Sequence, residues 1–365
     1  MPILIRYLLS QLGLALLVVW LGLVGLVVLF DLLASVNDMR GDYDTPAVLQ
    51  YVLMLVPRRF YDLLPVASLL ATLVVLGNMA NQSELIIMQV SGKSKIRLVT
   101  YLALPLVLLS CLSVIVFDSL ILDLQKRAIA ERENKIGRPG RDFIKPYWYK
   151  SKNTVIHFKY PVSPGLSKQV SIYELDEENF IFKRYIHAAS IAYQEQTQQW
   201  LLQDVKDYRF TQDQNNPDVL DYDKLVYKHS KTLPIALDIT PEFLQLAAVL
   251  PEFMRFHDLQ RYIAYLKEQT KPDYAYGVVY WSRLFVPFAT LVLIYLGAAF
   301  IFGPLRSASI GQRVMTGFFI GLIFNSVQSV AGAVSIVFAI NPLILVILPN
   351  VLVLLIAFML QRRVG

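Results

Sequence analysis

The sequence predicts an α-helical membrane protein with six transmembrane helices and an all-β domain inserted between helices three and four. Three observations predict this class. The chain of 365 residues is 55% hydrophobic and only 17% charged, whereas soluble domains carry about 25% charged residues. Its apolar residues gather in long runs without Asp, Glu, Lys or Arg. Between the third and fourth runs, short alternating segments replace them.

The uncharged runs cover residues 7–30, 63–83, 98–117, 284–305 and 314–361. A helix of about 20 apolar residues crosses a bilayer core, so the first four runs fit one crossing each and the last fits two. Asn341 and Pro342 interrupt the last run, and we divide it near 334–341. The core of a large soluble protein would not produce 48 consecutive uncharged residues. This run therefore argues against a soluble protein.

Charges in the short loops predict the orientation. The loops on one side carry a single acid, Glu84, and eight cations: Arg6, Lys93, Lys95, Arg97, Arg306, Arg313, Arg362 and Arg363. The opposite loops are acidic, with Arg40 among four aspartates. Cytoplasmic loops carry the excess of Lys and Arg, so we expect both termini in the cytoplasm. No small-residue cleavage site follows a short apolar core, so the first run is expected to stay as a span.

Three segments follow from this pattern: residues 1–135 with spans one to three, a β domain on the outer side at 136–255, and residues 256–365 with a connecting helix and spans four to six. Strands are predicted at 154–160, 170–175, 180–193 and 200–210, with a turn at 213–218, which indicates a sandwich or roll. The spacing of Leu259, Tyr262, Ile263 and Leu266 predicts an amphipathic helix over 258–269 with Asp258 as its N-cap. The lone Cys111 allows no intrachain disulfide.

Sequence motifs for catalysis are absent. Gly92-Lys93-Ser94 resembles the end of a phosphate-binding loop, but that motif requires glycine where Ile87 stands. The four histidines lack the spacing of metal ligands, and no nucleophile elbow occurs. We therefore expect no enzyme and no cofactor in this chain.

Cations at the outer membrane boundary are candidates for binding an anionic headgroup. Arg58 and Arg59 precede the second uncharged run, and a helix that begins near residue 48 carries both into the membrane. Arginine suits phosphate because of its forked donors. Lys126, Arg127 and Arg132 extend this candidate site. The plain alternatives are snorkelling for the first pair and a solvated helix for the other three.

The stretch after the second run is a candidate docking element. Glu84 lies beside Leu85 and Met88, and Ser91 and Gly92 end the segment. A short helix over about 82–94 with apolar anchors and one oriented charge fits a groove in a cytoplasmic partner. The plain alternative is an interfacial turn.

Two stretches and the overall arrangement then carry a resemblance to a known family. The segments "VPRRFYDLLPVASLLATLVVLGNMANQSELIIMQVSGKS" (56–94) and "WSRLFVPFATLVLIYLGAAFIFGPLRS" (281–307), with the arrangement of three spans, β domain and three spans, resemble the LptF/LptG permeases of lipopolysaccharide export. The "GPLRS" in particular looks like the LptG branch. The resemblance implies a β-jellyroll, a coupling helix containing Glu84, and an inner-membrane location in Gram-negative bacteria.

The same resemblance implies partners. These are an LptF-like permease subunit in a heterodimer, two copies of an LptB-like ATPase that holds ATP and Mg, an LptC-like single-span jellyroll protein and a periplasmic LptA-like bridge, with no nucleic acid. The family also has a lysine near the outer end of span one, but Phe30 and Asp31 stand there. We expect Asp31 to repel phosphate, and Arg40 or Arg58, Arg127 and Arg132 to carry more of the headgroup.

Three alternatives remain open from the sequence. One is a permease for another large anionic lipid. A secondary transporter favours ionisable residues inside the membrane, and spans four to six have none at their centres. A membrane scaffold outside the ABC class is the third, although six spans exceed what an anchor needs.

Overall fold

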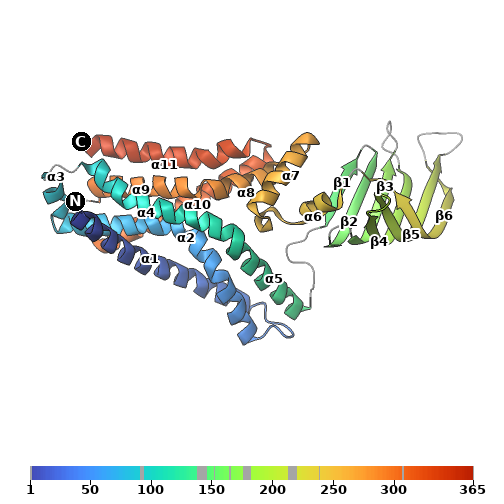
Figure 1. The fold of residues 1–365 in the computed structure, drawn as a ribbon, viewed down its shortest axis with the longest axis horizontal. Helices are drawn as coiled ribbons and strands as arrows, with labels where there is room; N and C mark the ends of the chain where they lie inside the picture. Colours follow the sequence, from blue (N-terminus) through green and yellow to red (C-terminus); the bar gives the residue numbers. More distant parts are fainter. Residues whose placement is uncertain are drawn as a thin grey trace. The chain divides into compact units, whose positions relative to one another are not determined.

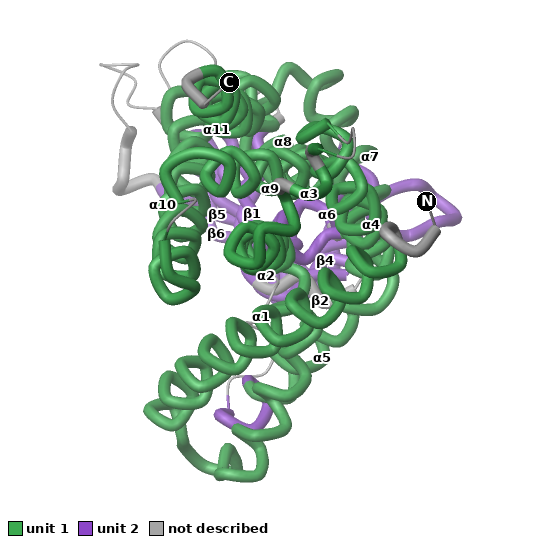
Figure 2. Tube along the Cα trace, turned by 90° about the vertical axis from the view of Figure 1, so that its left-hand side faces the viewer, with its two compact units in different colours: residues 1–132, 255–365 green, residues 133–254 purple. Residues whose placement is uncertain are grey.

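A computed structural model describes residues 2–90, 94–137, 146–151, 153–163, 166–175, 182–212, 220–237, 239–305 and 308–364. The chain divides into two compact units (Figure 2). Residues 1–132 and 255–365 form the helical unit, and residues 133–254 form the β unit.

The helical unit is built from the long helices of the chain (Figure 1). In chain order the helices are α1 (Pro2–Val36), α2 (Thr45–Asn81), α3 (Glu84–Val90), α4 (Lys95–Val116), α5 (Leu122–Ile136), α7 (Phe256–Glu268), α8 (Tyr274–Leu284), α9 (Val286–Phe302), α10 (Ile310–Val337) and α11 (Pro342–Val364). One π-helical turn, Phe117–Ile121, joins α4 to α5, which continues into the β unit. Both termini and α3 lie at one end of the helical unit, which we call the terminal end; the connection between α1 and α2 lies at the other, the loop end (Figure 1).

Among the described residues, five helices are long and apolar enough to cross a membrane, and the bent pair of α8 and α9 makes six if it counts as one span. The two helices meet at an angle of 55°. Pro287 lies in the first turn of α9, where it cannot donate the backbone hydrogen bond that would continue α8. The last uncharged run breaks between α10 and α11, within the predicted division at 334–341, and Ala339 takes a positive φ of 54° there.

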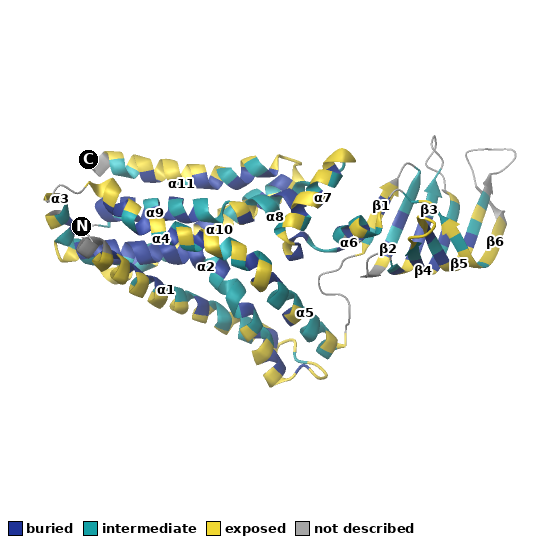
Figure 3. Ribbon diagram, in the orientation of Figure 1, coloured by how far each residue is buried: buried dark blue, intermediate teal, exposed yellow. Residues whose placement is uncertain are grey.

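Helix α2 is the centre of the helical unit. In its most apolar window 78% of the residues are buried, against 17% in α1 and 28% in α10. Figure 3 shows α1 and α11 with long exposed stripes on their outer sides. At Gly317 a Cβ would come within 2.6 Å of Leu70 and Leu73, so α10 packs directly on α2 through this glycine. The apolar side chains that remain exposed suit a lipid environment or another subunit.

The β unit is one antiparallel sheet of six strands. They are β1 (Tyr147–Ser151), β2 (Thr154–Ser163), β3 (Leu166–Leu175), β4 (Phe182–Gln194), β5 (Gln199–Gln212) and β6 (Leu220–Ile235), in the consecutive order β1 to β6. The four predicted strands correspond to β2–β5, whereas β1 and β6 were missed. Each described strand pairs with its neighbours in sequence. The predicted turn at 213–218 lies outside the described residues.

The sheet buries one face around Trp200, whose indole N–H donates to the Ile239 carbonyl at 3.0 Å. Helix α6 (Pro241–Ala248) covers part of this face with Leu244, and a short 3-10 turn, Pro251–Phe253, follows it. A row of aromatic rings crosses the sheet, and cross-strand pairs of this kind help to fix the register. Its stacked or tilted neighbours are Trp148 with His157, Tyr173 with Tyr185, Tyr185 with Tyr208, and Tyr208 with Tyr227.

The amphipathic helix near 258–269 is present as α7, but Asp258 is not its N-cap. The helix begins at Phe256, whose backbone N–H donates to the Asp118 carboxylate at 2.6 Å. Asp118 belongs to the π-helical turn, so the unpaired donor at the helix start is satisfied from another helix rather than locally. Asp258 lies in the first turn, where its charge still favours the helix dipole.

Candidate functional site

The predicted headgroup cations lie at the loop end of α2 and on α5. Helix α2 begins at Thr45, capped by the Asp44 side chain, so Arg58 and Arg59 belong to the helix itself, as predicted. Arg58 donates through Nε to both carboxylate oxygens of Asp62, at 3.0 and 2.9 Å, and through Nη1 to Gln125 on α5 at 3.1 Å. Arg58 therefore joins α2 to α5.

Arg59 forms a two-pronged ion pair with Asp31 of α1. The Nε and Nη2 donors lie 2.7 and 2.8 Å from the two carboxylate oxygens. This changes the expectation for Asp31. Its charge is taken up by the neighbouring arginine, so Asp31 forms part of a neutral pair.

The other predicted cations differ in their contacts. Arg132 donates to Asp38 at 2.7 Å, and its guanidinium lies 5.4 Å from the centre of the Tyr51 ring. Arg127 and Arg40 are exposed, and Lys126 is half-buried. Three of the six predicted cations are thus held by acids, and two are exposed to incoming anions.

Arg283 was missed as a candidate, although its guanidinium lies on the same Phe117 ring as that of Arg58. It is only 7% exposed, and its guanidinium carbon lies 4.7 Å from the centre of the Phe117 ring. The guanidinium of Arg58 lies 4.8 Å from the same ring, and Tyr61 packs on it at 4.4 Å. Phe117 opens the π-helical turn, a feature often found at functional sites. The sequence signal was a lone cation directly before the uncharged run at 284–305.

At the terminal end, Arg313 links α10 to α2. The side chain is 1% exposed and donates to the Leu305 carbonyl at 3.1 Å and to Asn81 at 2.9 Å. A Cβ at Gly77 would lie 2.5 Å from Arg313 Nη1, so this glycine provides the space that the guanidinium fills. From the sequence, Arg313 was predicted only to be one of the cytoplasmic loop cations.

The candidate docking helix is α3, which spans Glu84–Val90 and is shorter than the predicted 82–94. The Tyr7 hydroxyl donates to the Glu84 carboxylate, at 3.1 and 3.2 Å from its two oxygens. Leu85 is buried and Met88 packs against the helical core, whereas Val90 is 84% exposed. Ser91 and Gly92 lie outside the described residues. The helix thus has an inner apolar side and an outer side that includes Val90.

The described histidines are not gathered into a centre. His229 pairs with Asp204 at 2.7 Å on the β unit. Within the described ranges, no group of three or more His, Cys, Asp or Glu side chains is placed to hold a metal ion.

Membrane-capable helices before and after an inserted β unit, with buried arginines among those helices, define an integral membrane protein of the permease class. The chain belongs to the family described as "Lipopolysaccharide export system permease LptF/LptG", whose model matches residues 6–363.

Individual relatives agree with this family. The chain is 28% identical over 330 residues to the lipopolysaccharide export system permease protein LptG of Escherichia coli strain K12, which covers 89% of this chain and 88% of that protein. It is 26% identical over 347 residues to the protein of the same name from Haemophilus influenzae, with 93% of each chain covered. The predicted resemblance, including its closeness to the LptG branch, is confirmed.

Proposed function

We propose that this chain is a non-catalytic permease subunit of an ABC exporter that extracts lipopolysaccharide from the inner membrane and passes it toward the outer membrane. The observation that carries this proposal is the family match across residues 6–363. The β unit inserted between the two sets of helices fits a carrier for the extracted lipid. In this proposal both termini are cytoplasmic and the β unit is periplasmic.

The proposal requires partners. The chain pairs with an LptF-like permease subunit, and two copies of an LptB-like ATPase hold ATP and Mg, so that this chain needs no cofactor. An LptC-like protein and an LptA-like bridge receive the lipid. The exposed apolar faces of α1 and α10 support a second permease subunit and acyl chains in the membrane, because these faces are unsuited to water.

Headgroup binding in this proposal starts at the cations not held by acids. Arg127 and Arg40 are exposed, so a phosphate reaches them without breaking an ion pair. At Arg58, Arg59 and Arg132 a phosphate competes with Asp62, Asp31 and Asp38. Lys126 is half-buried, like the three paired arginines. Charge-assisted bonds to arginine then hold the headgroup, and its acyl chains follow the apolar faces.

Coupling in this proposal runs through α3. Leu85 and Met88 fix the helix to the bundle, while Glu84 and Val90 remain accessible to the ATPase. The contact from Tyr7 ties Glu84 to the start of α1. A movement of the ATPase is therefore passed to two helices of the bundle.

The test is co-purification and export with Glu84→Ala and, as a matched control, Gln82→Ala, two residues earlier, exposed and outside α3. We expect the wild type and the control to bring down a soluble ATPase together with lipopolysaccharide, and Glu84→Ala to lose most of both ATPase association and export. Intact association and export in Glu84→Ala would remove the coupling role. A wild-type chain that purifies without any ATPase would overturn the exporter proposal itself, and a different bound lipid would change its substrate.

A further inference from the structure

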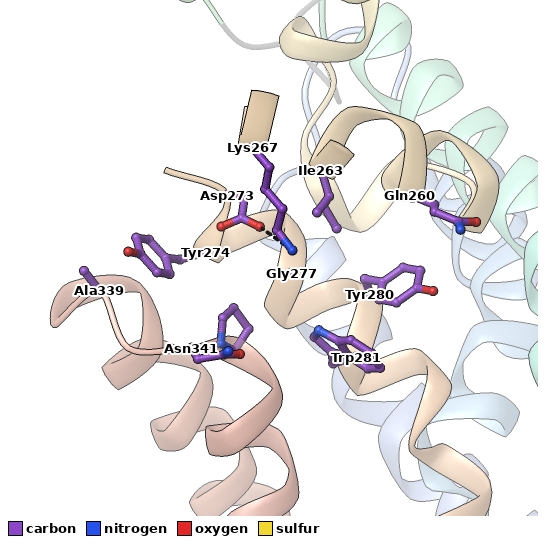
Figure 4. A pocket seen from close by; sticks show the side chains of 11 residues that line it. Gln260, Ile263, Lys267, Asp273, Tyr274, Gly277, Tyr280, Trp281, Ala339 and Asn341 are labelled. Atoms are coloured by element: carbon purple, nitrogen blue, oxygen red, sulfur yellow. Dashed lines mark ion pairs between the residues drawn. The ribbon is translucent and has the colours of Figure 1, made fainter. Parts of the chain in front are cut away.

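A pocket of about 480 Å³ lies at the loop end of the helical unit, and neither Arg58 nor Arg283 is among the residues that line it. It is formed by α7, by α8 from its first residue to Trp281, and by the connection from α10 to the first residue of α11 (Figure 4). At its base Gly277 faces Pro342: a Cβ on this glycine would lie 2.8 Å from the proline ring. The close approach of α8 to the start of α11 therefore shapes the floor.

The charges of this pocket balance. Among the residues that line it, Lys267 is the cation and Asp273 is the anion. The Lys267 ammonium and the Asp273 carboxylate lie 3.8 Å apart, at the long limit of an ion pair, and their side chains are 69% and 17% exposed. Figure 4 shows both side chains at the pocket wall. A loose pair of this kind contributes little to folding, and an incoming ligand replaces it at small cost.

The polar and aromatic lining adds further contacts. The Asn341 side-chain oxygen accepts the backbone N–H of Leu343 at 3.0 Å, and the described residues offer no acceptor to its amide nitrogen. The rings of Tyr274, Tyr280 and Trp281 line the pocket. Tyrosine and tryptophan are enriched where a membrane helix meets the headgroup layer, and α8 begins the bent apolar pair at this point.

We propose that this pocket binds the headgroup of a zwitterionic phospholipid, one that carries phosphoethanolamine. Its phosphate lies against the Lys267 ammonium and the Asn341 amide, and its ammonium lies against the Asp273 carboxylate and the aromatic rings. A positive group near an aromatic face is favourable by about 0.5–2 kcal/mol. The volume suits a headgroup with its glycerol, and the acyl chains descend beside α8.

The balance of charge separates this site from that of the exported lipid. A purely anionic headgroup meets the Asp273 carboxylate unfavourably, whereas a zwitterion satisfies both charges at once. The inference depends on the membrane location of α8 and not on the export reaction. A bound phospholipid fills the gap between α7, α8 and the start of α11, and so stabilises the bend into α9.

The test is native mass spectrometry of the full chain in its purified complex, after lipid exchange with phosphatidylethanolamine or phosphatidylglycerol of identical acyl chains. We expect phosphatidylethanolamine to be retained about fivefold better. Asp273→Asn removes the anion, so the preference should shift toward phosphatidylglycerol. Glu268→Gln is the matched control: it removes an acid from the exposed end of α7 outside the pocket, and should keep the wild-type preference.

A third arm separates the lipid from its free headgroup. Soluble glycerophosphoethanolamine offers the same charges without acyl chains. We expect it to compete only at concentrations about 100-fold or more above that of the lipid. Equal retention of the two lipids, an unchanged preference in Asp273→Asn, or competition by the soluble compound at the concentration of the lipid would each overturn the proposal. Loss of export with an unaltered lipid preference would bear only on the proposed function.

Discussion

Arg59 of α2 and Asp31 of α1 bind each other through two parallel hydrogen bonds, from Nε at 2.7 Å and from Nη2 at 2.8 Å. The geometry matches the forked donors of arginine to the two oxygens of a carboxylate. The pair fixes the loop end of α1 against the central helix. Asp31 is therefore a structural element of this chain.

Asp31→Ala is expected to destabilise the folded chain by about 1–2 kcal/mol, because Arg59 is left partly buried without its acid. The side chains are 20% and 31% exposed, so solvent screening keeps the effect below that of a fully buried pair. Thermal unfolding of the purified complex measures it. The double exchange Asp31→Arg with Arg59→Asp should recover most of the loss, and no recovery would mean that the pair itself contributes little.

Arg127→Ala is expected to reduce lipopolysaccharide export about threefold to tenfold without changing stability, because the side chain is exposed and its charge is available to phosphate. Arg58→Ala should lower both export and stability, since Arg58 also joins α2 to α5. A reconstituted export assay with a melting curve separates the two effects. Lys135→Ala, further along α5, serves as the control cation. Full export in alanine variants of Arg58, Arg127 and Arg132 alike would exclude these residues from headgroup binding.

The sequence predicted the membrane helices well because their signal is local. An uncharged run long enough to cross a bilayer needs no knowledge of its neighbours, and the break near 334–341 was visible in Asn341 and Pro342. The sheet was harder to predict. Strand β6 (Leu220–Ile235) contains six charged or imidazole side chains, so it has no apolar run that would predict a strand. Its strand conformation depends on pairing with β5.

The candidate site could be predicted as residue types but not as pairs. Arg58, Arg59 and Glu84 were found because charges are rare beside apolar runs. Their partners depend on how helices pack: Asp31 and Arg59 are 28 residues apart in sequence, and Arg313 and Asn81 are 232 apart. The N-cap at Asp258 was wrong for the same reason, since Asp118 of another segment satisfies the first N–H of α7.

Gly77→Ala is expected to destabilise the chain by about 1–3 kcal/mol, because the new methyl group would lie 2.5 Å from Arg313 Nη1 and 2.8 Å from its Cδ. The guanidinium must then move away from Asn81 and the Leu305 carbonyl. Gly22→Ala in α1 is the matched control: no atom lies within 4 Å of its added Cβ, so the better helix propensity of alanine makes it neutral or slightly stabilising. Equal melting temperatures for both variants would show that α10 can shift without cost.

Acid is expected to weaken the β unit through Asp207. The hydrogen bonds from Arg184, at 2.8 and 2.9 Å, hold the pKa of the Asp207 carboxyl below its ordinary value of 3.8. Because the folded pKa lies below the unfolded one, this stabilisation is complete above about pH 4 and is lost as the pH falls through the folded value. Amide exchange of β5 in the full chain, followed from neutral to acid pH, measures it.

Asp207→Asn should make the exchange of β5 faster at neutral pH and remove much of its dependence on acid, since the amide cannot ionise. Asp204→Asn is the control on the same strand. Asp204 is exposed and pairs with exposed His229, so this substitution should leave the protection of β5 nearly unchanged. If Asp207→Asn retained the acid dependence of the wild type, another group would carry it. Glu174 would then be the next residue to substitute, because its carboxylate oxygen lies 3.3 Å from Nη1 of the same Arg184.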